Sequence, residues 1–548
     1  MDWLALFCAF MLLKRVPLVS KVMLQLTQCF TISKNIALEG NIMKTRGLAL
    51  VASLTLVVAS LAGCGNASST SSKSSSSKSR SSKKTEVTSG ASKTQYSTMK
   101  DLKSKYDVVI IGAGGAGMSA ALAAKEKGLK PVILEKMPVA GGNTLKASSG
   151  MNASETKVQK KAGIKDSNEK FYQETLTGGH GTNDKAMLRF FVDHSASAVD
   201  WLDGMGIKLT NLTITGGMSV KRTHRPADGS AVGGYLVNGL LKNVKKNSIP
   251  IYVNADVTKI NEKAGKVNGV KVKFNQDKTK TISSKAVIVT TGGFGASKAM
   301  IKQYRPDLSK YVTTNQAGST GDGIKMITDL GGYTVDMDKI QIHPTVYQKP
   351  PYLVGEAVRG EGGILVNTAG DRFTNEMGTR DVVSAAINKQ PDQYAYVLFD
   401  GGVKQRVTAI NQYEKKGMVE SAATLSDLAK KLNVSSTELE KTVATWNDDV
   451  KAKKDSQYDR TTGMDNQLNT PKYYAIKIAP GIHYTMGGVK INPQTEVLKK
   501  SGQAIPGLYA AGEVTGGLHG DNRIGGNSVA EIVIFGRQAG TQVAKYVK

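Results

Sequence analysis

The fold is decided by residues 106–117, which read Tyr-Asp-Val-Val-Ile-Ile-Gly-Ala-Gly-Gly-Ala-Gly. The apolar run 106–111 is typical of a strand buried on both faces, and it leads directly into a turn containing three spaced glycines. A helical pattern follows over Met118–Lys127, and Pro131–Leu134 is predicted to be a second strand ending at Glu135. This order of strand, turn, helix and strand predicts a β-α-β unit.

The glycines of this turn indicate a dinucleotide site. Gly112 is expected to make the tight turn, Gly114 to let the backbone approach a pyrophosphate, and Gly117 to let helix and strand pack closely. Glu135 stands 18 residues after Gly117, where a carboxylate accepts hydrogen bonds from ribose hydroxyls. The motif alone leaves both NAD and FAD open.

Three later segments resemble the glutathione-reductase-like flavoproteins and favour FAD. The turn Gly141–Thr144 resembles their second FAD contact, residues 286–294 resemble a later strand followed by glycines, and residues 507–513 resemble the strand that closes over the flavin. The expected fold class is therefore α/β, with a Rossmann-like FAD-binding domain. In the complex-II relatives of such flavoproteins, FAD is linked covalently to a His near this glycine turn. This chain has Asn143-Thr144 there, so the resemblance implies that its FAD is bound non-covalently.

Composition and cysteine usage exclude several other classes. The 548 residues suffice for two or three packed units, and the net charge of +28 comes mostly from Lys spread along the chain. Because no aromatic and basic recognition cluster accompanies this charge, we expect no nucleic-acid partner and favour a basic face toward anionic lipid or cell-wall polymer. Cys8, Cys29 and Cys64 form no CxxC pattern, which excludes internal iron–sulfur clusters and c-type haem, and we expect no metal site.

The N-terminal region is predicted to export and anchor the protein. Residues 43–63 carry early positive charges and a short apolar stretch, as in a signal peptide, and the run up to Cys64 resembles a bacterial lipobox. We expect cleavage before Cys64 and a lipid anchor on its thiol, at the extracytoplasmic face of the cell membrane. The alternative is an ordinary membrane anchor. Residues 1–42 are predicted to be a translated leader, with Met43 as the true start.

Six further motifs follow one another and together resemble the soluble fumarate reductase (flavocytochrome c) flavoprotein family. They are His343-Pro-Thr345, Glu356-Ala-Val-Arg359, Arg372-Phe-Thr-Asn-Glu376, Thr379-Arg380-Asp381, His483-Tyr-Thr-Met-Gly-Gly488 and Asn522-Arg523-Ile-Gly-Gly-Asn527-Ser528. The resemblance covers residues 106–548. It implies an FAD-binding domain (106–340 and 481–548) interrupted by a mobile α+β capping domain (341–480), with the active site between them.

The resemblance also implies which residues form the site. The substrate carboxylates are expected to be held by His343, His483, Arg380 and Arg523, because guanidinium forks bind carboxylates in a bidentate manner. Arg380 is also the expected general acid, with Glu356 and Arg359 as the proton relay. The alternative is that these residues form structural ion pairs. The residues expected to contact FAD are Gly112, Ala113, Gly114, Gly117, Glu135, Lys136, Gly142, Asn143, Thr144, Ser149, Gly150, Met151, Asn152, Val257, Thr291, Gly292, Asp322, Tyr484, Glu513, Asn527, Ser528 and Val529.

The expected reaction is FAD-dependent reduction of the C=C bond of a small unsaturated carboxylate. Fumarate is favoured because His343 and Glu356 are retained, whereas relatives that reduce urocanate, acrylate, methacrylate or cinnamate usually change them. Two positions depart from the family: Gly355 lacks a hydroxyl, and Tyr484 stands where a second His is often found near the flavin. A flavin dehydrogenase running in reverse, on succinate or a 3-ketosteroid, and a lipid-anchored solute-binding protein remain alternatives. No role is assigned to His519, which is expected to be a solvent-facing loop residue.

The segment 64–105 is predicted to be a disordered tether. Between Ser71 and Lys105 it carries nine Lys or Arg against two acidic residues, and it is rich in Ser. Within it, residues 86–92 resemble a flavinylation sequence whose last hydroxyl, here that of Ser92, is joined to FMN by a flavin transferase. An FMN at Ser92 would carry electrons from a quinol-linked or flavin-based membrane donor to FAD. The alternative is that these residues are a plain linker.

Overall fold

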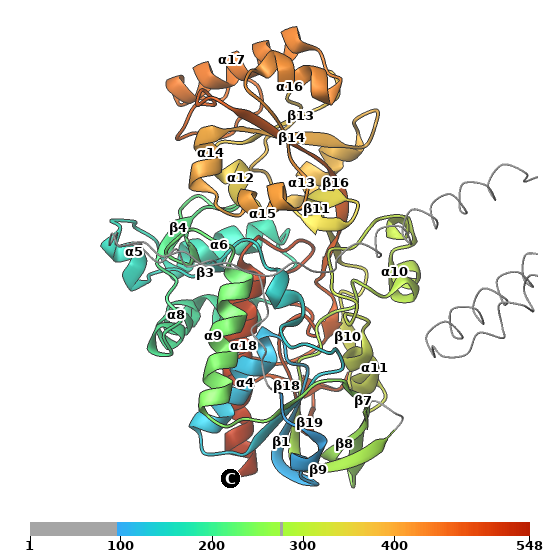
Figure 1. The fold of residues 1–548 in the computed structure, drawn as a ribbon. Helices are drawn as coiled ribbons and strands as arrows, with labels where there is room; N and C mark the ends of the chain where they lie inside the picture. Colours follow the sequence, from blue (N-terminus) through green and yellow to red (C-terminus); the bar gives the residue numbers. More distant parts are fainter. Residues whose placement is uncertain (1–95, 275–277) are drawn as a thin grey trace, which may run out of the picture. The chain divides into compact units, whose positions relative to one another are not determined.

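The computed structural model describes residues 96–274 and 278–548, which belong to one compact unit (Figure 1). The predicted leader, signal peptide, Cys64 and Ser92 lie outside the described residues. Within the described ranges, no helix combines the length and the apolar character needed to cross a membrane.

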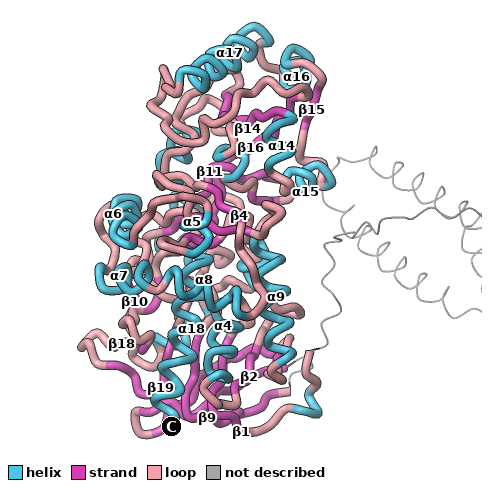
Figure 2. Tube along the Cα trace, turned by 90° about the vertical axis from the view of Figure 1, so that its left-hand side faces the viewer, coloured by secondary structure: helices cyan, strands magenta, loops and turns pink. Residues whose placement is uncertain are grey.

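The larger of the sheets has eight strands and contains the predicted β-α-β unit (Figure 2). Its path is β18-β19-β9-β1-β2-β6, and β8 and β7 extend it beyond β9. The central strands β19, β9, β1, β2 and β6 run parallel, as expected for apolar strands buried on both faces. The bounds are β1 (Lys105–Ile111), β2 (Pro131–Leu134), β6 (Ile251–Tyr252), β7 (Ala255–Lys263), β8 (Lys266–Phe274), β9 (Thr279–Val289), β18 (Glu496–Leu498) and β19 (Ala504–Ala510).

Two long helices lie side by side against this sheet (Figures 1 and 2). They are α4 (Gly115–Glu126), which follows the first glycine-rich turn, and α18 (Asn527–Val547), which ends the chain. Their close approach requires glycine, because a Cβ at Gly536 or Gly540 would lie 2.6 or 2.3 Å from a carbonyl oxygen of α4. The C-terminal helix is thereby packed directly behind the predicted cofactor turn. A third helix, α9 (Val232–Lys246), packs against α4.

Smaller elements surround the ends of the sheet. A three-stranded sheet has the order β3-β5-β4, and β10 pairs with β17. The bounds are η1 (Met99–Asp101), η2 (Gly142–Lys146), β3 (Met151–Asn152), α5 (Lys157–Lys161), α6 (Asn168–Gly178), α7 (Lys185–Asp193), α8 (Ser195–Gly204), β4 (Asn211–Thr213), β5 (Thr223–Arg225), α10 (Lys298–Tyr304), η4 (Pro306–Leu308), α11 (Asp322–Thr328), β10 (Thr334–Val335) and β17 (Gly488–Val489).

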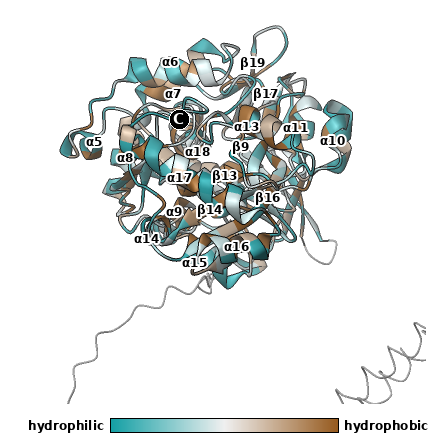
Figure 3. Ribbon diagram, turned by 90° about the horizontal axis from the view of Figure 1, so that it is seen from above, coloured by the Kyte–Doolittle hydropathy of each residue, from teal (hydrophilic) through white to brown (hydrophobic). Residues whose placement is uncertain are grey.

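A second hydrophobic cluster runs from Val354 to Ile478 and surrounds an antiparallel sheet of six strands. The order is β12-β11-β16-β14-β13, with β15 also paired to β16. Helix α16 packs against β15, β16 and α17. Helices α16 and α17 lie at the same end of the molecule as β13 and β14, as Figures 1 and 3 show. The bounds are β11 (Ile340–Gln348), β12 (Pro351–Leu353), α12 (Ala357–Gly360), β13 (Ile364–Val366), α13 (Arg380–Asn388), β14 (Ala395–Asp400), α14 (Gly401–Arg406), α15 (Ile410–Lys415), β15 (Glu420–Ala422), α16 (Leu425–Leu432), α17 (Ser436–Ala452) and β16 (Tyr473–Thr485).

Strand β16 runs from one hydrophobic cluster into the other. Its first part pairs with β14, and its last part pairs with β11, where His343 lies opposite Gly481. Ile478 belongs to the second cluster, whereas Ile482, on the same strand, belongs to the first. The boundaries predicted after residues 340 and 480 therefore fall inside β11 and β16, which continue through the junction.

The predicted tether ends earlier than residue 105. The Ser97 amide donates to the carbonyl of Ile251 at 2.9 Å, and the Tyr96 hydroxyl accepts from the Ala140 amide at 3.0 Å. Strand β1 already begins at Lys105. These hydrogen bonds hold residues 96 and 97 against the rest of the fold. The Ser- and Lys-rich composition had predicted that they would be solvated and disordered.

Candidate active site

The first glycine-rich turn needs glycine for two separate reasons. Gly112 has φ of +104°, a conformation that L side chains rarely adopt. A Cβ at Gly117 would lie 2.0 Å from the carbonyl oxygen of Gly112. The turn therefore brings the N-terminus of α4, capped by Gly114, to the end of β1. This is the arrangement in which backbone N–H groups face a phosphate.

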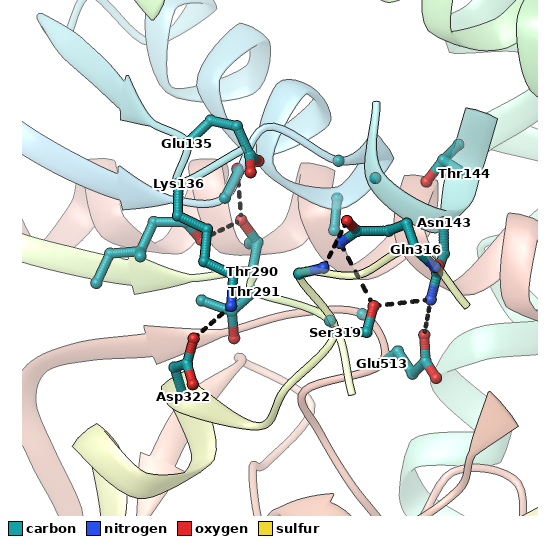
Figure 4. A pocket seen from close by; sticks show the side chains of 18 of the residues that line it. Glu135, Lys136, Asn143, Thr144, Thr290, Thr291, Gln316, Ser319, Asp322 and Glu513 are labelled. Carbon is teal, nitrogen blue, oxygen red and sulfur yellow. Dashed lines mark hydrogen bonds and ion pairs between the residues drawn. The ribbon is translucent and has the colours of Figure 1, made fainter. Parts of the chain in front are cut away.

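Glu135 closes one end of the same pocket. Its carboxylate accepts hydrogen bonds from the amides of Ala113 and Met137, both at 2.8 Å. Burial raises the pKa of Glu135 above its ordinary value, although the two amide hydrogen bonds oppose that effect. Nearby, Lys136 and Asp322 form an ion pair of 2.5 Å that joins the end of β2 to the start of α11 (Figure 4).

The other end of the pocket is organised by Asn143 (Figure 4). Its amide nitrogen donates to the Ser319 hydroxyl at 3.1 Å, and its oxygen accepts from the Gln316 amide at 2.8 Å. The same nitrogen lies 3.3 Å from the carboxylate of Glu513, which also accepts from the Thr485 amide at 3.1 Å. Burial raises the pKa of Glu513 to about 7.

These groups line one cleft, whose wall combines backbone, apolar and a few polar side chains, as is typical of cofactor and small-molecule sites. The structure brings together on its wall a large part of the residues predicted to bind FAD. They are Gly112, Gly114, Glu135, Lys136, Gly142, Asn143, Thr144, Val257, Thr291, Gly292, Asp322 and Glu513.

The other predicted cofactor residues do not line this cleft. Ala113 and Gly117 belong to the first turn, whose shape they determine. Asn152 donates to the side-chain oxygen of Asn527 at 2.7 Å, which joins β3 to the start of α18. Tyr484 faces the cluster of arginines described below rather than the cleft. The remaining residues flank these contacts in the sequence and are Ser149, Gly150, Met151, Ser528 and Val529.

Further lining residues were not predicted from the sequence. Gly115, Ala116 and Thr290 directly neighbour predicted residues, so the glycine-rich motifs already pointed to them. Gln316 and Ser319 belong to a loop without any motif and reach the cleft only through tertiary structure. The others are Ile111, Leu134, Ala255, Asp256, Gly318, Met326, Ala511, Gly512 and Ile532.

A second group of polar side chains gathers around the buried carboxylate of Glu356. The same oxygen accepts from Arg380 Nε at 2.7 Å and lies 3.7 Å from His343 Nε2 and 4.0 Å from Arg359 Nη2. Glu356 caps α12 and Arg380 begins α13, so two short turns aim these side chains at one point. Burial alone would raise the pKa of Glu356, but the guanidinium groups, led by Arg380, hold it below its ordinary value.

His343 and His483 lie across from each other, with ring centroids 5.2 Å apart. Burial, reinforced by Arg380, lowers the pKa of both rings well below the ordinary value, so both are neutral near pH 7. His343 Nδ1 accepts from the Thr345 amide at 3.2 Å, which leaves the proton of the neutral ring on Nε2. His483 Nδ1 lies 2.7 Å from the Thr314 hydroxyl, which orients its ring.

Several buried donors of this group have no hydrogen-bond partner among the described residues. They are His343 Nε2, Arg359 Nε, and both Nε and Nη2 of Arg523, whose buried guanidinium interacts electrostatically with Arg380 and Glu356. Burial lowers the pKa of Arg523 to about 10, so its guanidinium remains cationic at neutral pH. Because buried polar groups are nearly always hydrogen-bonded, unpaired donors of this kind indicate an anionic ligand.

Other Arg and Glu residues of the recognised motifs form structural ion pairs. Arg372 binds Glu376 at 2.9 Å and Asp455 at 2.9 Å, and Arg460 binds Glu376 at 3.0 Å. All four side chains are fully buried and mutually paired, unlike the group around Glu356. The first set is a fully paired packing network, whereas the group around Glu356 keeps unpaired donors.

The structure adds a neighbour at one position that the sequence singled out and changes the expectation at another. A Cβ at Gly355 would lie 2.9 Å from the Ser148 hydroxyl, so Ser148 occupies the space beside this glycine. The prediction that His519 faces solvent is wrong: only 3% of it is exposed, and it lies 3.1 Å from the carboxylate of Glu531. Residues 96–274 and 278–548 contain no group of three or more His, Cys, Asp or Glu that could hold a metal ion.

Comparison with known proteins adds independent evidence. The family described as FAD binding domain matches residues 107–529. An NADH:fumarate oxidoreductase of Klebsiella pneumoniae is 50% identical over 440 residues, covering 80% of this chain and 48% of that protein. The chain thus spans about half the length of that relative. A fumarate reductase (cytochrome) of Shewanella frigidimarina is 41% identical over 464 residues, covering 84% of this chain and 81% of that protein.

A solved structure agrees with these matches. The open conformation of a flavocytochrome c3 fumarate reductase aligns with a TM-score of 0.68 at 38% identity, covering 82% of this chain and 79% of that one. The matches confirm FAD as the cofactor and confirm the prediction of a flavin-dependent oxidoreductase acting on CH–CH bonds. The chain belongs to the fumarate reductase flavoprotein family, whose FAD-binding domain it carries.

Proposed function

We propose that the protein reduces fumarate to succinate at the group of side chains around Glu356. The observation that carries this proposal is the set of buried, unpaired donors on His343 and Arg523 beside the Arg380–Glu356 pair. A dicarboxylate supplies the acceptors that these donors lack. The relatives named as fumarate reductases support the same substrate.

The cleft fits FAD, and its residues indicate how the cofactor is held. The turn at Gly112 and the N-terminus of α4 would bind the pyrophosphate, Glu135 would bind a ribose, and Asn143 and Glu513 would bind toward the flavin end. When bound, FAD supplies the hydride that adds to one carbon of the double bond.

The substrate is bound and oriented by the chain's own donors. Arg523 and His343 present unpaired N–H groups, and His483 lies opposite His343. A carboxylate held by these groups cannot rotate freely, so the double bond has one defined orientation. The cationic guanidinium groups also stabilise the negative charge that develops on the carboxylate during reduction.

The proton reaches the second carbon from Arg380. A guanidinium releases a proton reluctantly, so the group that returns one must be close, and Glu356 lies 2.7 Å from Arg380 Nε. Arg359 is the next member of the relay, with Nη2 4.0 Å from Glu356. That distance is about 1 Å longer than a hydrogen bond. A small shift of either side chain would therefore bring Arg359 into hydrogen-bond contact with Glu356 and complete the relay. One hydride and one proton together convert fumarate into succinate.

The test is the rate at which the purified holoprotein oxidises reduced methyl viologen with different enoates. We expect fumarate to be reduced faster than urocanate, acrylate, methacrylate or cinnamate. Faster turnover of a monocarboxylate would overturn the dicarboxylate assignment, and faster oxidation of succinate or a 3-ketosteroid by an acceptor dye would reverse the direction. A colourless protein that binds a solute without turnover would favour the solute-binding alternative.

We further propose that the enzyme works at the extracytoplasmic face of the membrane, anchored by lipid on Cys64. FMN on Ser92 would pass electrons from a membrane donor to FAD. The support lies in the sequence, namely the lipobox-like run before Cys64 and the flavinylation-like run 86–92. Wild-type protein that fractionates with membranes but whose intact mass shows no lipid on Cys64 would overturn the anchor.

A further inference from the structure

A buried polar cluster lies beside the proposed substrate site and takes no part in the chemistry described above. It consists of Tyr484 on β16, Glu531 on α18 and His519 on the loop between β19 and α18. The Tyr484 hydroxyl donates to one carboxylate oxygen of Glu531, and His519 Nε2 lies 3.1 Å from the same oxygen. All three side chains are nearly inaccessible to solvent.

The direction of these hydrogen bonds follows from the groups involved. Burial raises the pKa of Tyr484 well above its ordinary value, so the phenol keeps its proton. A carboxylate can only accept, and therefore the protons of Tyr484 and of His519 Nε2 both point at Glu531. The ring of Tyr484 is thus held at its hydroxyl end by the hydrogen bond to Glu531, as well as by packing.

The Arg523 guanidinium lies over the face of the Tyr484 ring. The guanidinium carbon lies 4.2 Å from the ring centroid, within the range of a cation–π contact. Arg523 Nη1 donates to the carbonyl of Ile524 at 3.1 Å, but Nε and Nη2 have no partner among the described residues. The described residues offer Arg523 no hydrogen-bonded carboxylate, so its orientation depends on one backbone contact and on the ring.

We propose that Tyr484 is a positioning residue that holds the Arg523 guanidinium so that its unpaired donors meet a substrate carboxylate, with Glu531 and His519 holding the ring. A ring is suited to this task because it attracts the cation without occupying any N–H group. A phenol that donates to a buried carboxylate gains electron density, which strengthens that attraction. The inference rests on the proposed function and assigns a role to the residue that departs from the family pattern.

The test is a double-mutant cycle on the FAD-loaded enzyme, with variants Tyr484→Leu, Arg523→Ala and both together. The readouts are the Kd of succinate, from the change in flavin absorbance, and the KM and kcat for fumarate with reduced viologen. We expect Tyr484→Leu to raise Kd and KM by roughly 2- to 30-fold, the range of a cation–π contact, with a smaller change in kcat. In the Arg523→Ala background the same substitution should change Kd by less than about twofold.

Control variants separate positioning from packing. Tyr484→Phe keeps the ring and should change Kd less than Tyr484→Leu does. Tyr474→Leu removes another buried tyrosine, which is stacked on Phe399 away from the FAD cleft, and should lower thermal stability without changing Kd. Equal effects of Tyr484→Leu with and without Arg523 would overturn the inference.

Two outcomes need a separate reading. If Tyr484→Leu does not fold, Glu531→Gln takes its place in the cycle. An effect of Glu531→Gln on the Kd of succinate that differs at least twofold between the wild-type and Arg523→Ala backgrounds supports the inference. Equal effects in the two backgrounds overturn it. If the wild-type enzyme neither binds succinate nor reduces fumarate, the proposed function fails and the inference fails with it. If the wild-type enzyme is active but the substitutions at Tyr484 and Arg523 act independently, the inference is overturned and the proposed function stands.

Discussion

Replacing Arg380 by Lys tests the proposed acid directly. The positive charge is retained, but the planar fork is lost. In the structure Arg380 Nε donates to Glu356 at 2.7 Å while Nη1 donates to Gln341 at 2.9 Å. A single ammonium group cannot occupy both positions and also reach the substrate, so Lys must abandon part of this geometry.

The expected loss follows from two effects. Removing one charge-assisted hydrogen bond costs about 1.5–3 kcal/mol. Losing a well-placed general acid lowers the rate by about 10²- to 10⁴-fold, which corresponds to about 3–5 kcal/mol. If the two effects add, kcat falls by about 10³- to 10⁶-fold, while the FAD cleft, which Arg380 does not line, keeps its cofactor.

The assay is fumarate-dependent oxidation of reduced viologen, with FAD content measured on the same sample. Arg406→Lys is the matched control, because Arg406 contacts Glu361 at 3.2 Å with a third of its side chain exposed, and its loss should change kcat by less than about twofold. An Arg380→Lys enzyme that holds FAD and works within tenfold of wild type would refute the acid role.

Three further predictions concern binding, pH and the tether. Arg523→Ala and His483→Ala should each raise the KM for fumarate by roughly 5- to 150-fold, since an unpaired buried carboxylate costs about 1–3 kcal/mol, and an unchanged KM would show that the binding roles are misassigned. Because burial raises the pKa of Glu513 from 4.5 to about 7, the folded apo-protein binds more protons than the unfolded chain between those values. Its free energy of unfolding should therefore fall by up to about 3 kcal/mol as pH rises through that window, and urea titrations of Glu513→Gln should lack this slope. Ser92→Ala, made with a flavin transferase, should lose the flavin that survives denaturation while viologen-driven activity stays intact. A wild-type intact mass without an FMN adduct would contradict that prediction.

The FAD-binding unit could be predicted because its signals are local. The apolar run 106–111 and the spacing of the glycines that follow it are compatible with few other structures. Accordingly, β1, α4 and β2 lie where these residues predicted them. Gln316 and Ser319 could not be predicted in the same way. They reach the cleft through hydrogen bonds to Asn143, more than 170 positions away in the chain, and their own loop carries no motif.

The substrate group depended on the order of the motifs rather than on any single residue. Arg372–Glu376 and Arg380–Glu356 are equally plausible ion pairs in the sequence, and only the structure separates the fully paired network from the site with unpaired donors. His519 was misjudged because its glycine-rich surroundings are typical of exposed loops. It lies buried beside Glu531, which the following helix, α18, supplies.

The crossing of β11 and β16 between the two hydrophobic clusters has a mechanical consequence. His343 lies on β11 and His483 on β16, two residues beyond the point where His343 pairs with Gly481. The pairing is irregular on both sides of this point, between Gln341 and Ile342 and between His343 and Val346, so the strand ladder is interrupted beside both imidazoles. The two rings of the proposed substrate site therefore lie on the strands that join the two hydrophobic clusters. A change in the arrangement of these clusters would change the distance between the rings, and with it the space available to a carboxylate.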